Sequence, residues 1–150
     1  MLVKDIMTRA TKSIRPDTRL QEAAALMCLN RFTTLPITDE NDKLIGILAE
    51  RDVLSYLFPK VGEFMHSGAA KVDFESYELD YKKVLPLKAI DLMTKNVISV
   101  SSETPLLKAV ATMAKGNLRR IPVVDDGKLV GIVSLGDIHR AIFLKSFASG

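Results

Sequence analysis

The sequence predicts a mixed α+β fold, an α/β sandwich in which two pseudo-symmetric β-α-β-β-α units pack through their sheets. The main observation is an internal repeat, because "KDIMTRATKSIRPDTRLQEAAALM" aligns with "IDLMTKNVISVSSETPLLKAVATM". The match continues where "TTLPITDENDKLIGIL" aligns with "RRIPVVDDGKLVGIV", with one residue fewer in the turn, so the chain is a duplication of one unit. A unit of roughly sixty residues buries too small a fraction of its surface to be comfortably stable alone, and its strands are apolar on both faces. We therefore expect the two copies to pack together.

Each copy opens in the same way. The stretches "VKDIMT" and "AIDLMT" predict a short helical entry, followed by a brief β-like run that ends at Ile14 or Val100. Next come "PDT" and "SET", where Asp17, Thr18 or Thr104 can cap the helix that follows. In the second copy this helix has an apolar stripe at three- and four-residue spacing, formed by Leu106, Leu107, Ala109, Val110, Met113 and Ala114.

The second half of each copy predicts a hairpin and a final helix. The first helix ends at Asn30 or at Gly116-Asn117, and the apolar runs "LPIT" with "LIGIL", and "IPVV" with "LVGIV", read as strand pairs. Their links "DENDK" and "DDGK" have hairpin length, and Asp-Gly in the second is a good turn signal. The last helix begins near Asp52 or Asp137 and is expected to run through Phe58 or Phe143.

The repeat predicts three segments: a first repeat at 1–58, a connector at 59–88, and a second repeat with a C-terminal helix at 89–150. The connector carries apolar residues at helical spacing, namely Phe74, Tyr77, Tyr81 and Val84. We expect this stripe to cover exposed core. A partner-binding surface and a lid over a ligand are the alternatives.

Composition narrows the class of protein. The 150 residues are 47% hydrophobic and 26% charged, as in ordinary soluble proteins, and the net charge of +3 is spread among interspersed acids and bases. This predicts neither a nucleic-acid partner nor a membrane span, and the N-terminal stretch does not read as a signal peptide, so the expected location is the cytoplasm. The single cysteine, Cys28, is expected to be a buried structural thiol.

The motifs occur in one order, twice: D-[IL]-M-T, a short strand, a "DT" or "ET" helix start, h-P-h-h-D and G-h-h-x-x-x-D, where h is apolar. This order resembles a tandem pair of CBS domains, also called a Bateman module, over everything except the connector and the extreme C-terminus. The resemblance implies a regulatory module that binds an adenosine-containing ligand between its two units, without catalysis, and signals to a partner protein. It also implies a homodimer. The expected ligand is AMP, ADP or ATP ahead of S-adenosylmethionine or NAD, acting as a regulatory ligand and not as a catalytic cofactor.

The resemblance assigns a main site to the second copy. There the pattern G-h-h-[ST]-x-x-D implies an Asp that holds the ribose hydroxyls and a Ser or Thr that meets phosphate. A basic residue before h-P-h-h reaches the phosphate, and the h-P-h-h segment and the opposing segment of the first copy wrap the adenine. The residues at these positions are Ser134, Gly136, Asp137, Arg119, Arg120, Ile121, Pro122, Thr11, Lys12 and Ser13.

The first copy matches this pattern only in part. It keeps Asp52, but Ala49 replaces the hydroxyl residue and Thr33-Thr34 replace the arginine pair. The second, weaker site is expected to contain Asp52, Thr34, Val97, Ile98 and Ser99. Charge-assisted bonds from arginine contribute on the order of 1.5–3 kcal/mol each, so their loss predicts about a hundredfold weaker binding or more.

Several of these residues also have purely structural interpretations. Ser134 and Asp137 fit a helix-capping box, although Asp52 keeps the acidic position where Ala49 cannot cap. Strand alternation lets only one of the two arginines point into a cleft, and Arg120 is expected to be that one. His139 is expected to be a surface or satisfied residue, and neither it nor His66 suggests a metal site.

Other paired residues need no function. Met7, Met27, Met93 and Met113 recur at matched places and are expected in the core. Asp39 and Asp125 are assigned to the hairpin turns.

The main alternative function is a scaffold that dimerises or holds another protein without a ligand. An enzyme is not expected, because the sequence contains no G-x-x-x-x-G-K, G-x-G-x-x-G or G-x-S-x-G motif and no Cys/His spacing typical of metal ligands or nucleophiles.

Overall fold

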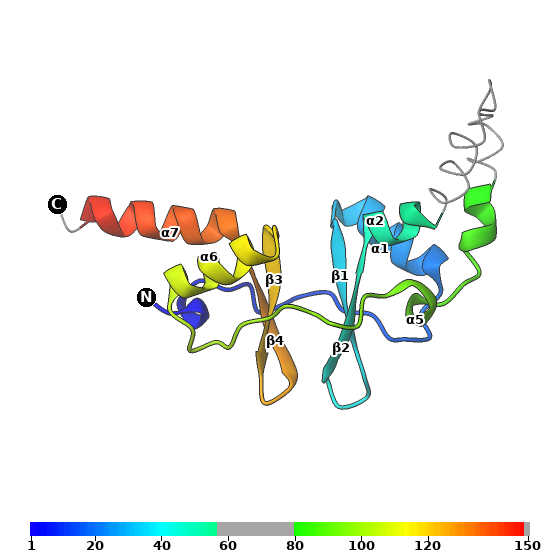
Figure 1. Ribbon diagram of the computed structural model, residues 1–150, viewed down its shortest axis with the longest axis horizontal. Helices are drawn as coiled ribbons and strands as arrows, with labels where there is room; N and C mark the ends of the chain where they lie inside the picture. The colour runs from blue at the N-terminus through cyan, green and yellow to red at the C-terminus, as the bar shows by residue number, and fades with distance from the viewer. Residues whose placement is uncertain (57–79, 149–150) are drawn as a thin grey trace, which may run out of the picture. The chain divides into compact units, whose positions relative to one another are not determined.

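The computed structural model describes residues 1–56 and 80–148 (Figure 1). By contacts the chain divides into two compact units. Unit 1 comprises Met1–Lys12, Glu40–Leu44 and Asn96–Gly150, and unit 2 comprises Ser13–Asp39 and Ile45–Lys95. The predicted mixed fold with two units of matching element order is confirmed.

Unit 2 is built on the hairpin of β1 (Thr34–Thr38) and β2 (Leu44–Ala49), with α1 (Leu20–Asn30), α2 (Glu50–Ser55) and α5 (Ala89–Leu92) around it. The brief strand predicted to end at Ile14 is reduced to one parallel bridge between Ile14 and Ile37. The core of this unit consists of Ile14, Leu20, Ala23, Met27, Leu35, Ile37, Leu48, Val53, Val84 and Ala89.

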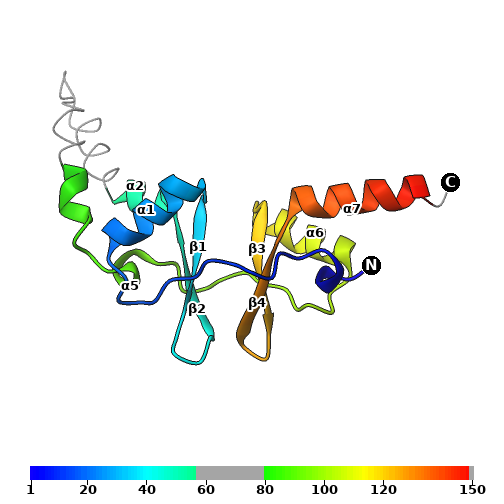
Figure 2. The same ribbon diagram turned by 180° about the vertical axis from the view of Figure 1, so that it is seen from behind.

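Unit 1 repeats this plan with η1 (Val3–Asp5), α6 (Leu106–Lys115), β3 (Arg120–Asp125), β4 (Lys128–Ser134) and α7 (Leu135–Ala148). Strands β3 and β4 pair antiparallel, and α6 and α7 lie on one side of this hairpin in both views (Figures 1 and 2). Asp126 and Gly127, with φ of 51° and 80°, form the turn, as the Asp-Gly pair predicts. The core contains Val3, Met7, Val100, Leu106, Ala109, Met113, Ile121, Val123, Val133 and Ile138.

The D-h-M-T segments are exchanged between the repeats. The N–H of Val3 donates to the carbonyl of Thr104 at 2.8 Å, and the N–H of Ala89 donates to that of Thr18 at 2.8 Å. Each unit therefore combines the hairpin and helices of one repeat with the D-h-M-T segment of the other.

The glycines of the two G-h-h motifs make room for these exchanged segments. A Cβ at Gly131 would lie 2.8 Å from the carbonyl oxygen of Thr8 and 2.9 Å from the sulfur of Met7. A Cβ at Gly46 would lie 2.6 Å from the sulfur of Met93. The glycine of the motif thus has a packing role in both copies.

Both predicted helix caps are wrong in position. The N-cap residues are Arg19 and Pro105, and neither makes a side-chain capping bond. Thr18 instead accepts the N–H of Arg15 at 3.0 Å, which closes the turn before the helix. Asp17 and Thr104 also precede these N-caps, so their side chains lie outside the helices.

The apolar stripes are confirmed in part. Leu106, Ala109 and Met113 are buried, but Leu107 is 70% exposed and Ala114 is exposed. Cys28 is also exposed, so its assignment as a buried thiol is wrong. Each helical residue is turned by about 100° from its neighbour, and Cys28 and Leu107 follow directly after buried residues on the inward face.

The described end of the connector covers core, as predicted. Val84 is fully buried, and Tyr81 and Leu87 pack against the core of unit 2. Burial raises the pKa of Tyr81, with a smaller contribution from nearby Cys28. Phe58, His66, Phe74 and Tyr77 lie outside the described residues.

The remaining core predictions also hold. Met7, Met27 and Met113 are buried, and Met93 packs against the core of unit 2. Helix α7 runs through Phe143. Among the helices that the structure describes, none combines the length and apolar character needed to cross a membrane.

Candidate functional site

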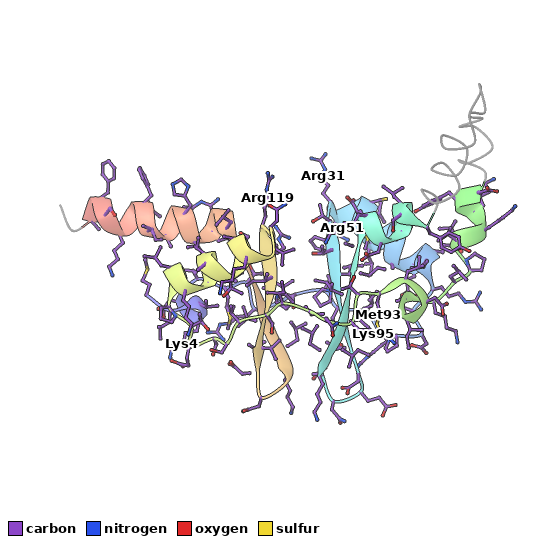
Figure 3. The ribbon with its side chains drawn as sticks, viewed as in Figure 1. Lys4, Arg31, Arg51, Met93, Lys95 and Arg119 are labelled. Carbon is purple, nitrogen blue, oxygen red and sulfur yellow. The ribbon has the colours of Figure 1, made fainter. Side chains whose placement is uncertain are left out.

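Five predicted residues of the main site gather at one end of the β3–β4 hairpin in unit 1. The carbonyl of Arg119 accepts the N–H of Leu135 at 2.8 Å, which ties the start of α7 to the start of β3. Arg120 pairs with Ser134 in the strand register, and Gly136 and Asp137 follow in the first turn of α7. Figure 3 shows Arg119 at this end of β3. The hairpin thus brings two arginines, a hydroxyl and a carboxylate to one corner.

Ser134 caps α7. Its hydroxyl oxygen accepts the N–H of Asp137 at 3.1 Å, so the capping interpretation of this residue holds in the structure. A capping hydroxyl satisfies one helix-terminal N–H and leaves others open, and free N–H groups at a helix start attract phosphate. Capping and phosphate contact by Ser134 are therefore compatible.

The Asp137 carboxylate is half-exposed, with 35% of the side chain accessible. It accepts a bond from the Arg140 guanidinium at 3.2 Å, and that arginine side chain is 70% exposed. Exposed pairs of this kind contribute only ~0–1 kcal/mol. A ligand hydroxyl can replace the arginine at small cost.

Asp52 is used differently. Its carboxylate accepts the backbone N–H of Ala49 at 2.8 Å, and so closes the start of α2. Asp5 and Asp91 make the same reach-back bond, to Leu2 at 2.7 Å and to Lys88 at 2.9 Å. The acidic position at Asp52 thus has a structural explanation that does not require a hydroxyl at Ala49.

A cavity of about 510 Å³ opens beside the corner in unit 1, between α6 and α7. Arg119, Gly136 and His139 line it together with apolar residues, and a Cβ at Gly136 would meet open space. Arg120, the arginine expected to point into a cleft, is not among the lining residues. Both arginines and His139 are exposed.

The remaining predicted residues of the main site lie partly in the core of unit 1 and partly in a stretch without regular secondary structure. Ile121 and Pro122 are buried in β3. Thr11 and Lys12 lie in the stretch without regular secondary structure that follows Thr8 in unit 1, and Ser13 begins unit 2.

The residues of the second predicted site fall in both units. In unit 2, Thr34 begins β1, and the N–H of Glu50 donates to the carbonyl of Thr33 at 2.9 Å, as Leu135 does to Arg119. Val97, Ile98 and Ser99 belong to unit 1. Ile98 is 40% exposed, and its Cδ1 lies 2.7 Å from the place of a Cβ on Gly116.

Two basic residues of unit 2 were missed by the motif comparison. Arg31, in the left-handed conformation with φ of 55°, ends α1, and Arg51 stands beside Asp52 in α2. Both are exposed, and Figure 3 places them at the end of unit 2 where α2 begins. The sequence signal was the arginine in "NR", at the end of α1, and in "ERD", at the start of α2. The second copy has no arginine at the positions that align with these two.

A carboxylate with a lowered pKa lies elsewhere in unit 1. Asp125 accepts bonds from the Ser102 hydroxyl at 2.5 Å and its N–H at 2.9 Å, and these bonds lower the pKa of Asp125. Asp125 therefore orders the loop before α6 in addition to ending β3. Within the described residues, no group of three or more His, Cys, Asp or Glu side chains is arranged to hold a metal ion.

Known proteins share this architecture. The CBS domain family matches residues 3–59 and 89–144. The protein MJ1426 of Methanocaldococcus jannaschii is 31% identical over 95% of this chain and 91% of its own length. Other curated relatives are longer, and the chain spans 57% of CBSX1 from Arabidopsis thaliana, to which it is 34% identical.

Two solved structures carry ligands. The crystal structure of CBSX2 in complex with AMP is 29% identical, with a TM-score of 0.71 over 97% of this chain and 98% of that one. The CBS domain pair of MJ0100, in complex with 5-methylthioadenosine and S-adenosyl-L-methionine, is 28% identical, with a TM-score of 0.71 and the same coverage of 97% and 98%.

Proposed function

Because the chain belongs to the CBS domain family and carries two copies of the domain, we propose that it is a regulatory module that binds AMP, ADP or ATP and signals this binding to a partner protein. The observation that carries the proposal is the corner of unit 1. There the Asp137 carboxylate accepts a bond from the Arg140 side chain, and no backbone N–H of the described residues donates to it, whereas Asp52 accepts the N–H of Ala49. The AMP complex of CBSX2 and the S-adenosylmethionine complex of MJ0100 support an adenosyl ligand.

Each residue of the corner has a role in this proposal. The Asp137 carboxylate accepts hydrogen bonds from both ribose hydroxyls after it releases Arg140. The open N–H groups of α7, the Ser134 hydroxyl and one of the two arginines, Arg119 or Arg120, hold phosphate. Ile121 and Pro122, with the stretch from Thr11 to Ser13, enclose the adenine.

The second site, with Asp52, Thr34 and the stretch from Val97 to Ser99, is proposed to bind more weakly. One oxygen of the Asp52 carboxylate, Oδ2, already accepts the N–H of Ala49, so fewer acceptor sites remain for a ligand than at Asp137. Arg31 and Arg51 offer positive charge near this helix start and would hold phosphate in place of the missing arginine pair.

The proposal includes a homodimer in the cytoplasm, no catalysis, and the segment boundaries 1–58, 59–88 and 89–150. The apolar surface on the outer part of α7 supports self-association, because Phe143, Leu144 and Phe147 are 53%, 58% and 74% exposed. These last turns run past α6 (Figures 1 and 2). The same surface favours the second candidate function, a ligand-independent scaffold.

The test is thermal shift and calorimetry with AMP, ADP, ATP, NAD and S-adenosylmethionine. We expect saturable binding of an adenine nucleotide to the wild-type protein and at least about tenfold weaker binding in Asp137→Asn, because the ribose bonds are lost. Asp91→Asn is the matched control, since Asp91 is also at the third position of a helix but its carboxylate accepts the backbone N–H of Lys88.

If none of these compounds binds at millimolar concentration, the scaffold function replaces the nucleotide proposal. Equal losses in Asp137→Asn and Asp91→Asn would show that the effect on binding is structural.

A further inference from the structure

The cavity between α6 and α7 in unit 1 combines an apolar lining with a single permanent charge. Its volume of about 510 Å³ falls within the range of ligand-holding clefts, ~300–1,000 Å³. Among the described residues that line it, none is acidic. The lining consists of five apolar residues, one glycine and two polar residues, namely Leu107, Val110, Leu135, Ile138, Ile142, Gly136, Arg119 and His139. The cavity is therefore an apolar space whose permanent charge is positive.

The two arginines at the start of β3 face opposite sides of the hairpin. Arg120 pairs with Ser134 in the strand register, and paired residues of an antiparallel hairpin have their side chains on the same face. Ile121 and Val123 lie on the other face and are buried in the core with residues of α6 and α7. Arg119 directly precedes β3 and continues the alternation on this second face, which explains why it lines the cavity and Arg120 does not.

The helices present no acid to the cavity. Helix α6 contains no Asp or Glu, and Asp137 is the single acid of α7. Leu135, Ile138 and Ile142 line the cavity at three- and four-residue spacing, and so lie on one side of α7. Asp137 lies about 200° around the helix axis from Leu135, because each residue turns by about 100°. An anion in the cavity therefore meets no opposing carboxylate from either helix.

The Arg119 guanidinium is available to a ligand. Its side chain is exposed at the end of β3 (Figure 3). In the part of the chain that the structure describes, no acid forms an ion pair with it. An arginine can bind a carboxylate through two parallel hydrogen bonds, which is the strongest form of this contact. An apolar space beside an unpaired guanidinium is complementary to a hydrocarbon chain that ends in an acid.

We propose that this cavity binds an aliphatic monocarboxylate, whose chain lies between α6 and α7 and whose carboxylate binds Arg119. The ring of His139 offers a further N–H donor at the rim. Gly136 leaves room there, since a Cβ at this position would meet open space. Arg120, on the face of Ser134, is then the arginine that holds phosphate in the proposed nucleotide site.

The cavity is coupled to the proposed nucleotide site, because Arg119 and Gly136 border both. A phosphate at the start of α7 and a carboxylate on Arg119 bring two anions close together, and like charges repel. We therefore expect AMP and the carboxylate to weaken each other's binding by the same factor, about fivefold or more. This coupling rests on the proposed nucleotide function, whereas binding of the carboxylate alone does not.

The first experiment is calorimetry on the full chain without nucleotide, with hexanoate, octanoate and decanoate as probes. We expect saturable one-to-one binding that tightens by up to about tenfold for each two CH₂ groups added, because these groups leave water for the apolar cavity. n-Decylammonium is the matched control, since it has the same chain length and the opposite charge. It should bind at least about tenfold more weakly than decanoate.

The second experiment varies the protein. Arg119→Gln is expected to weaken decanoate binding at least about tenfold without loss of folding, since the side chain is exposed. Arg120→Gln should weaken AMP binding instead. Leu107→Glu places an acid on the cavity wall at a position that is 70% exposed, and should also weaken decanoate binding at least about tenfold. Leu29→Glu, 83% exposed on α1, is its matched control and should have no effect.

Three results would overturn the proposal: no saturable binding up to about 1 mM decanoate, equal binding of decanoate and n-decylammonium, or equal effects of Arg119→Gln and Arg120→Gln on decanoate binding. A dimer that becomes monomeric with Leu107→Glu, and that excludes decanoate, would assign the cavity to a second copy of the chain instead. If decanoate binds and AMP does not, the nucleotide proposal fails and this one stands. If both bind without affecting each other, the coupling is wrong.

Discussion

The two strand-to-helix corners, before α2 and before α7, have the same backbone plan and the same acid but use the acid in different ways. In unit 1 the hydroxyl of Ser134 satisfies the N–H of Asp137, and the Asp137 carboxylate bonds only the flexible Arg140. In unit 2 Ala49 has no hydroxyl, and Asp52 bonds the Ala49 N–H. The difference in the residue three positions earlier, Ser134 or Ala49, therefore accompanies a difference in the partner of the carboxylate, an exposed arginine in unit 1 and a backbone N–H in unit 2.

The two motif glycines should give the largest difference between the units. Gly131→Ala is expected to reduce the free energy of unfolding by about 2–3 kcal/mol, because the new Cβ meets the backbone oxygen of Thr8. Gly46→Ala should cost about 1 kcal/mol, because its nearest contact is the flexible Met93 side chain, with the backbone oxygen of Thr94 at 3.1 Å.

Urea unfolding of both variants measures this difference. An equal loss in the two variants would mean that the exchanged segments adjust equally well, and that the distinction between backbone and side-chain contacts has no energetic consequence.

The second largest difference is expected between Asp52 and Asp137, in the free energy of unfolding that is lost when each acid is replaced. Asp52→Ala is expected to cost about 1 kcal/mol of stability, since it leaves the Ala49 N–H without its acceptor. Asp137→Ala should cost only a few tenths, because the pair with Arg140 is exposed. Thermal and urea unfolding without ligand measure both, and a larger loss at Asp137 would contradict the division of roles.

The caps themselves offer a reciprocal test. Ser134→Ala is expected to lose about 1 kcal/mol with the capping bond, and Ala49→Ser to gain up to about that amount. Ala49→Ser, Asp52→Ala is the informative double variant, because the new hydroxyl should recover part of the stability lost at Asp52. No recovery would show that the corner of unit 2 does not accept a hydroxyl cap.

The smallest expected difference depends on pH. The Ser102 bonds lower the pKa of Asp125, so their contribution to stability is complete above the ordinary Asp pKa of about 4 and is lost as the pH falls below it. In the first repeat Pro16 occupies the place of Ser102 and offers neither a hydroxyl nor an N–H.

The urea midpoints of the wild type and Ser102→Ala should therefore converge progressively as the pH falls from about 5 to below the ordinary Asp pKa of about 4, because the lowered pKa of Asp125 lies below that value. A constant difference across this range would show that Asp125 does not titrate with the loop.

The repeat and its turn chemistry were sufficient to predict the duplication, the hairpins and the helix order, but they did not reveal that the D-h-M-T segments are exchanged between the repeats. Asp126-Gly127 is a local signal, and the matched methionines report on burial because they recur. The exposed positions could not be predicted in the same way. Leu107 and Cys28 fit an apolar pattern, but their exposure depends on what packs beside α6 and α1, and that is non-local.

The candidate site shows the same limit. The motifs placed Ser134, Asp137 and the arginines at one corner because the hairpin and the helix start are adjacent in sequence. They did not reveal that Asp52 bonds Ala49, because a reach-back bond depends on a side-chain rotamer. Arg31 and Arg51 were missed since a repeat comparison finds only what both copies share.

The exchange of D-h-M-T segments has a consequence for how the chain is made. Lys4 pairs with Glu103, 99 residues away, at 2.7 Å, so the beginning of the chain reaches its place only after most of the second repeat exists. Unit 2 ends at Lys95 and can form while the ribosome is still adding the second repeat, whereas unit 1 must wait and then close a long loop. Met1–Lys12 therefore remains without its final neighbours until the second repeat has been synthesised, and unit 1 assembles after unit 2.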